Sequence, residues 1–176
     1  GRYAGIVGCY NGFRAYGIKH KTYDLKPAHL CEDRKEMEGE LSKVKLPNDA
    51  KIVLTGFGRV GHGAREIIGL LPIQEVGSEE FLNQEFNNPV FTHLELSEYN
   101  ARSEDGDFDR REFYKDPSGY ESTFPRYTAK ADMYIACHYW AEESPFLFTR
   151  EDMKSSDWRT SVVADISCDI DGPVAS

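Results

Sequence analysis

Apolar and polar residues alternate in blocks from residue 50 onward, and these blocks predict strands and helices in turn. The run KIVLT, residues 51–55, is short and has the apolar centre Ile-Val-Leu, as is typical of a buried parallel strand. Further strands are expected at 73–76, 90–96, 132–137 and 161–167, and helices at 62–71, 79–87 and 149–155, the last capped by Thr149. This order predicts an α/β fold of Rossmann type, an open and mainly parallel sheet with helices on both faces.

The first 49 residues have a different pattern. Apolar and aromatic side chains recur at helical spacing within residues 1–20, and a charged helix is expected at 32–46. Pro47-Asn48-Asp49 then marks a boundary. We therefore expect an N-terminal helical segment, 1–49, packed on a Rossmann domain, 50–176.

The least regular stretch of the chain is 98–128, which is rich in Asp, Arg, Glu and aromatic residues. Phe113-Tyr114 and Tyr120 to Phe124 are expected to anchor short helices on the surface. Neither expectation carries an obvious chemical role.

Composition narrows the classes of partner. The 176 residues carry a formal net charge of -9, which disfavours nucleic acid and anionic lipid as partners. No apolar run is long enough to span a membrane, and no signal peptide is visible. The four cysteines form no CxxC pair, so we expect reduced thiols and a cytoplasmic location. The chain begins at Gly1 rather than Met, which suggests part of a larger enzyme, although a purification scar would also explain the glycine.

The strongest local motif is G-x-G-x-x-G, formed by Gly56, Gly58 and Gly61 between a predicted strand and a predicted helix. The first glycine permits a tight turn, the second allows the backbone to approach a pyrophosphate, and the third allows the helix to pack near the strand. The helix N-terminus then offers free N–H groups to the phosphates. The motif in this context predicts dinucleotide binding.

An acidic residue that binds the adenine ribose is expected at the end of the second strand. Glu75 and Glu79 are the nearest carboxylates, and either could equally be a solvated surface residue. No Arg or Lys occurs between Glu66 and Tyr99, which favours NAD over NADP as the cofactor.

Two further residues are candidates for the ligand end of the sheet. His138 follows the predicted strand 132–137 and could face nicotinamide or substrate, or be an ordinary loop histidine. Asp165 interrupts the apolar run SVVADIS, where an unpaired buried carboxylate would be costly, so a place near the cofactor is expected. The other four histidines do not cluster, and no metal site is expected.

Three segments resemble the lysine-forming saccharopine dehydrogenases. They are GRYAGIVGCYNGFRAYG near the N-terminus, the glycine-turn segment IVLTGFGRVGHGA, and ADMYIACHYWAEESPFLFTREDM followed by SVVADISCDIDGP. The resemblance covers most of the chain except about 21–48 and 98–128, and extends more distantly to alanine dehydrogenase and the transhydrogenase NAD domain. It implies a two-domain enzyme that transfers hydride between NAD and an amino-acid carbon–nitrogen bond.

The resemblance also implies roles for particular residues. Those matched to cofactor contacts are Arg2, Gly56, Gly58, Arg59, Val60, Gly61, His138, Ala164, Asp165, Ile166 and Ser167. His138, Tyr139 and Trp140 match the loop beside nicotinamide and substrate. The acid–base lysine and histidine of that family belong to its other domain, so this chain alone is expected to hold NAD without turnover, with an amino-acid or 2-oxo-acid substrate bound through the other domain.

Two departures from the family pattern bear on the substrate. A carboxylate-binding arginine of the family falls at Tyr3, and a phenylalanine of its substrate pocket falls at Val7. Loss of the arginine puts saccharopine itself in doubt as the substrate. The alternative hypotheses are a non-catalytic Rossmann module that senses NAD(H) and regulates a partner, and a structural domain whose glycines only form a turn. The sequence leaves the oligomeric state open.

Overall fold

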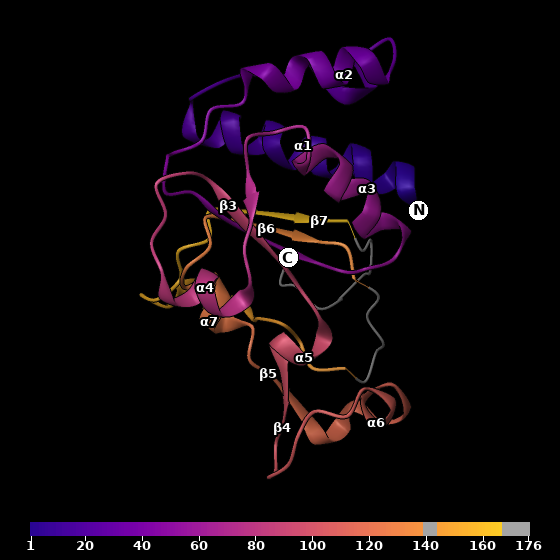
Figure 1. Ribbon diagram of the computed structural model, residues 1–176, viewed down its shortest axis with the longest axis vertical. Helices are drawn as coiled ribbons and strands as arrows, with labels where there is room; N and C mark the ends of the chain where they lie inside the picture. The colour runs from indigo at the N-terminus through magenta and orange to yellow at the C-terminus, as the bar shows by residue number, and fades with distance from the viewer. Residues whose placement is uncertain (139–143, 167–176) are drawn as a thin grey trace.

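The computed structural model describes residues 1–138 and 144–166, which form an α/β domain around a five-stranded parallel sheet (Figure 1). The strands of this sheet, in chain order, are β1 (Lys51–Thr55), β2 (Gln74–Glu75), β3 (Val90–Leu94), β6 (Met133–Ala136) and β7 (Val162–Asp165). They are arranged in the order β2-β3-β1-β6-β7, and every neighbouring pair is parallel. The predicted Rossmann-type sheet is confirmed.

Helices cover both faces of the sheet, as the sequence predicts (Figure 1). The described helices are α1 (Arg2–His20), α2 (Arg34–Glu40), α3 (Arg59–Ile68), α4 (Ser78–Asn83), α5 (Leu96–Tyr99), α6 (Arg110–Lys115), α7 (Pro125–Thr128) and α8 (Arg150–Lys154), with 3-10 turns at Ala28–Leu30, Leu41–Lys43 and Pro117–Gly119. One core cluster joins α1 and α3 to the sheet, and a second joins Phe81 of α4, Tyr99 of α5 and Tyr127 of α7 to its opposite face.

Glycines set the distance between α1 and α3. A Cβ atom on Gly5 would lie 1.9 Å from the carbonyl oxygen of Val60, and one on Gly63 would lie 2.0 Å from that of Arg2. The two backbones therefore touch, and α1 also packs on β7. The N-terminal helix is thus part of the same core as the Rossmann sheet.

Several predicted elements are shorter than expected. The helix expected at 32–46 is α2 followed by a 3-10 turn, the strand expected at 73–76 is reduced to two exposed edge residues, and the helix expected at 79–87 ends at Asn83. By contrast, α3 begins earlier than expected, at Arg59, because the glycine turn leads directly into it.

The expectation that Tyr120 to Phe124 anchor a short helix holds only at its end, where Phe124 is the N-cap of α7 (Pro125–Thr128). Tyr120–Ser122 is β5, which pairs antiparallel with β4 (Asn100–Arg102). The Tyr120 ring packs edge-on against Phe108 and Phe113, and this aromatic cluster holds the segment extended. The other expectation in this stretch is confirmed, since Phe113 and Tyr114 lie in α6.

Within the described residues, no helix combines the length and the apolar character needed to cross a membrane.

Candidate functional site

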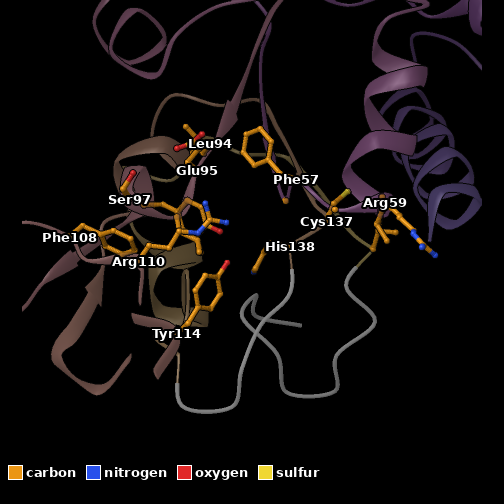
Figure 2. A pocket seen from close by; sticks show the side chains of 16 residues that line it. Phe57, Arg59, Leu94, Glu95, Ser97, Phe108, Arg110, Tyr114, Cys137 and His138 are labelled. Carbon is orange, nitrogen blue, oxygen red and sulfur yellow. The ribbon is translucent and has the colours of Figure 1, made fainter. Parts of the chain in front are cut away.

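A cleft of about 1090 Å³ opens at the carboxyl ends of the central strands β1, β3 and β6. Its lining residues are Gly56, Phe57, Gly58, Arg59, Val60, Leu94, Glu95, Leu96, Ser97, Tyr99, Phe108, Arg110, Tyr114, Cys137, His138 and Ile166. Figure 2 shows Cys137 and Arg59 on one side of this cleft and Phe108, Arg110 and Ser97 on the other. Ligands of open α/β sheets bind at this edge, at the point where the connections from the neighbouring strands β1 and β6 run toward opposite edges of the sheet.

The three motif glycines have different surroundings. Gly56 has φ +101°, a conformation that favours glycine, and a Cβ there would lie 2.4 Å from the carbonyl of Cys137. A Cβ on Gly61 would lie 2.0 Å from the carbonyl oxygen of Gly56. A Cβ on Gly58 would meet no described atom within 4 Å and would project into open space. Gly56 and Gly61 are therefore required by packing, whereas Gly58 only keeps space free at the cleft.

The N-terminus of α3 lies at this free space. Gly58 is the N-cap of α3, and Arg59 and Val60 are its first residues. The unpaired N–H groups of a first helical turn, together with the helix dipole, favour an anion. The exposed Arg59 adds a formal positive charge to this end of the cleft.

His93 of β3 supports the glycine turn from behind. Its Nε2 donates a hydrogen bond to the carbonyl oxygen of Gly56 at 2.6 Å, and Phe57 stacks on its ring at a centroid distance of 3.7 Å. Arg65 donates to Nδ1 of the same ring at 3.1 Å. Burial lowers the pKa of His93 below its ordinary value, which favours the neutral ring that this pattern requires.

The strand that follows α3 in the chain is not the neighbour of β1. β2 lies at the edge of the sheet, and β3 lies between β2 and β1. The carboxylate of Glu75 at the end of β2 accepts hydrogen bonds from both terminal nitrogens of Arg65, at 2.8 Å each. Glu75, one of the two carboxylates considered for the ribose contact, is thus paired with Arg65 and does not line the cleft.

Glu95, rather than Glu75, lies at the carboxyl end of the strand next to β1. It directly follows β3, is exposed, and lines the cleft together with Gly56 and Gly58. Its carboxylate also accepts the backbone N–H of Glu98 in the capping box of α5. A carboxylate has two oxygens and about four acceptor sites, so it can accept further hydrogen bonds from a ligand.

The irregular stretch 98–128 forms the outer wall of the cleft. Phe108, Arg110 and Tyr114 line it, and the Arg110 guanidinium lies 5.6 Å from the centre of the Tyr114 ring (Figure 2). Arg110 thus brings a cation to the end of the cleft where Glu95 lies, although no Arg or Lys occurs between Glu66 and Tyr99.

A buried hydrogen-bonded chain reaches the cleft at His138, which lies beyond the end of β6. The Tyr134 and Thr55 hydroxyls lie 2.7 Å apart, and the Thr55 hydroxyl lies 2.8 Å from Nδ1 of His138. Burial lowers the pKa of His138 to about 4, opposed by the nearby Asp165. His138 is 7% exposed and is neutral at pH 7.

The residues predicted from the family resemblance are only partly brought together. Gly56, Gly58, Arg59, Val60, His138 and Ile166 line the cleft, whereas Gly61 packs beneath the turn. Ala164 packs against Gly12 of α1, since a Cβ on Gly12 would lie 2.9 Å from the Ala164 Cβ. Asp165 ends β7 with an exposed side chain, so it is not the buried carboxylate that its apolar surroundings in the sequence indicated.

Arg2 lies at the same end of the domain as the glycine turn, because Gly1 adjoins Arg59. Its guanidinium is paired with the carboxylate of Glu66 on α3 through two hydrogen bonds of 2.6 Å. Its cofactor contact remains a prediction. Tyr139, Trp140 and Ser167 lie outside the described residues.

Sequence reasoning missed the side of the cleft formed by Leu94, Glu95, Ser97, Phe108 and Arg110. A signal for Glu95 was present, since it lies near the end of the predicted strand 90–96, but β3 ends at Leu94 and so leaves Glu95 at its carboxyl end. No comparable signal marks Phe108 or Arg110, which reach the cleft only through the tertiary packing of the insertion.

Known proteins resemble this chain over most of its length. It is 28% identical to the mitochondrial α-aminoadipic semialdehyde synthases of Rattus norvegicus and Bos taurus, in matches that cover 88% of this chain. It is 27% identical to the same enzyme of Mus musculus. The chain spans only 19% of the length of these relatives. No family model matches the chain.

Proposed function

We propose that this chain binds NAD(H) in the cleft and serves as the cofactor domain of an oxidoreductase that transfers hydride at an amino-acid carbon–nitrogen bond. The observation that carries the proposal is the free space at Gly58, between the N-terminus of α3 and the end of β1. Packing requires the other two motif glycines, whereas no packing contact requires Gly58, and a ligand that approaches the backbone there would benefit from the missing side chain.

The residues fit the separate parts of a dinucleotide. The first turn of α3 and Arg59 would hold the pyrophosphate, since both present positive charge. Glu95, at the end of the strand next to β1, would accept hydrogen bonds from the adenine ribose. Its negative charge would repel a 2′-phosphate, which supports NAD rather than NADP.

The nicotinamide would then lie toward His138 and Ile166, at the ends of β6 and β7 on the other side of β1. Bound there, it supplies hydride at its C4 atom. The chain's own contribution is to hold and orient the ring and to limit the access of water.

The resemblance to saccharopine dehydrogenases and the names of the relatives support an amino-acid substrate. As the family resemblance implies, the proposal places the substrate site and the acid–base residues in a second domain. Saccharopine is not proposed as the substrate itself, since Tyr3 replaces the expected carboxylate-binding arginine and its side chain is 72% exposed.

A matched pair of variants tests cofactor binding by titration calorimetry with NADH. Gly58→Ala should leave the free energy of unfolding within about 1 kcal/mol of wild type, because its Cβ meets open space, yet weaken NADH binding at least about tenfold. Gly61→Ala should instead destabilise the fold by about 1–3 kcal/mol. Failure of wild type to bind millimolar NADH, or wild-type affinity in Gly58→Ala, would overturn the proposal.

The reaction is tested on the entire gene product by following NADH oxidation with pyruvate plus ammonia and with 2-oxoglutarate plus lysine. Activity with a 2-oxo acid and an amine is the expected result. NADH binding without oxidation by any such pair would reject the substrate class and favour an NAD(H)-sensing module.

A further inference from the structure

The Nε2 atom of His138 is a buried polar atom without a hydrogen-bond partner among residues 1–138 and 144–166. A buried donor or acceptor left unpaired costs about 1–3 kcal/mol. The ring nevertheless lies in the wall of the cleft, next to the glycine turn (Figure 2). An unpaired buried atom of this kind calls for a partner, which a ligand in the cleft would supply.

The chain of hydroxyls behind the ring determines which kind of partner fits. In the described part of the chain, the Tyr134 hydroxyl hydrogen-bonds only to Thr55, and both residues are fully buried. If Thr55 donated to Tyr134, the proton of the Tyr134 hydroxyl would have no acceptor. The arrangement that gives both hydroxyl protons an acceptor has Tyr134 donating to Thr55 and Thr55 donating to Nδ1 of His138.

This arrangement fixes the tautomer of the imidazole. Because Nδ1 accepts a hydrogen bond from Thr55, a neutral ring carries its proton on Nε2. The unpaired atom at the cleft is therefore a donor, and the matching ligand atom is an acceptor such as a carbonyl oxygen.

The position of His138 selects the part of the ligand. His138 lies beyond the end of β6, and Glu95 lies beyond the end of β3, on opposite sides of β1. With the adenosine on the Glu95 side, the ring next to His138 is the nicotinamide. The carboxamide oxygen is the one carbonyl that this half of the dinucleotide carries.

We propose that His138 donates a hydrogen bond from Nε2 to the carboxamide oxygen of nicotinamide, and that Tyr134 and Thr55 are positioning residues that hold the imidazole in this tautomer. The inference rests on the proposed NAD(H) binding and adds a specific contact to it.

A neutral donor suits both redox states of the cofactor. The nicotinamide ring is positively charged when oxidised, and an imidazolium beside it would repel it. Desolvation at this buried position keeps the ring neutral, with a pKa lowered to about 4 although the carboxylate of Asp165 raises it. The hydrogen bond is thus available to NAD and to NADH alike.

The test compares NADH with ADP-ribose, which lacks the nicotinamide, in calorimetric titrations of the 176-residue chain. His138→Leu and Thr55→Val remove the donor and its support, whereas His138→Gln and Thr55→Ser retain an N–H or a hydroxyl. The first two variants should bind NADH about 3- to 10-fold more weakly and ADP-ribose as wild type does. The second two should keep most of the NADH affinity.

The tautomer is read independently from two-bond ¹⁵N–¹H couplings of His138 at neutral pH. A protonated Nε2 and an unprotonated Nδ1 are expected in wild type and in Thr55→Ser, with the preference lost in Thr55→Val. A protonated Nδ1 in wild type, or equal losses for NADH and ADP-ribose in His138→Leu, would overturn the inference and leave NAD(H) binding intact. Failure of wild type to bind either ligand would reject the proposed function together with this inference.

Discussion

The ring of His93 donates a hydrogen bond to the carbonyl oxygen of Gly56 at 2.6 Å. A side chain of the neighbouring strand thus holds the first residue of the glycine turn, and the stacked Phe57 covers its ring. The turn is therefore supported by β3 as well as by its own sequence.

Removal of this support should weaken cofactor binding. His93→Leu is expected to lower the free energy of unfolding by about 1 kcal/mol and NADH affinity by about 3- to 10-fold, because the carbonyl of Gly56 loses its donor. Urea denaturation and calorimetry measure the two effects. The exposed His29 supplies the control, and His29→Leu should change neither. Wild-type NADH affinity in His93→Leu would show that the turn needs no support from β3.

Charge at the outer end of the cleft should set the choice between NADH and NADPH. Glu95→Ser removes the carboxylate and leaves Arg110 in the cleft, so the affinity for NADPH should rise about tenfold relative to NADH. The double variant with Arg110→Gln should lose this gain. Fluorescence titration with both nucleotides measures the ratio.

Glu75→Gln is the matched control for this prediction. Its carboxylate is bound to Arg65 outside the cleft lining, so the substitution should leave the nucleotide preference unchanged. A change in nucleotide preference with Glu75→Gln but not with Glu95→Ser would indicate that Glu75 of β2, and not Glu95, binds the ribose.

The contact between α1 and α3 should tolerate no added methyl group. Gly63→Ala places a Cβ 2.0 Å from the carbonyl of Arg2 and should destabilise the domain by about 2 kcal/mol. Gly39→Ala, within α2 and with no described atom within 4 Å, should be neutral or stabilising by about 0.5 kcal/mol. Thermal denaturation distinguishes the two, and equal stability would contradict the close packing of the helices.

His138 should make the domain sensitive to acid. The pKa of His138 is about 4 in the folded chain, against an ordinary value of 6.5. Between these two pH values the unfolded chain binds a proton at this residue and the folded chain does not. Stability should therefore fall as the pH falls, by about 2 kcal/mol for this group between about pH 7.5 and pH 5. The difference between wild type and His138→Gln in urea denaturation isolates this contribution. Parallel losses in the two proteins would contradict it.

The sequence predicts the kinds of elements well because hydrophobic periodicity is a local property. Thr149, for example, caps α8 through a hydrogen bond from the backbone N–H of Asp152, as its place before a polar helix indicates. Strand order is different, because it depends on contacts between distant segments. Because β2 lies at the edge of the sheet and β3 lies next to β1, Glu95 rather than Glu75 lines the cleft beside the glycine turn.

The hydrogen-bonded chain from Tyr134 to His138 could not be predicted for the same reason. Thr55 and His138 are 83 residues apart in sequence and meet because β1 and β6 pair in a register that aligns Thr55 with Ala136. Sequence reasoning found His138 from its place after a strand, but not the groups that fix its protonation.

The two ends of the cleft come from separate stretches of the chain. Residues 94–114 contribute Glu95, Ser97 and Arg110 at one end, and His138 and Ile166 stand at the other. If the cleft holds NAD(H) as proposed, substitutions or insertions in the first stretch should alter which nucleotide is accepted and leave the proposed nicotinamide contacts unchanged. Under the proposed function, this architecture would allow cofactor preference to evolve independently of the hydride-transfer chemistry.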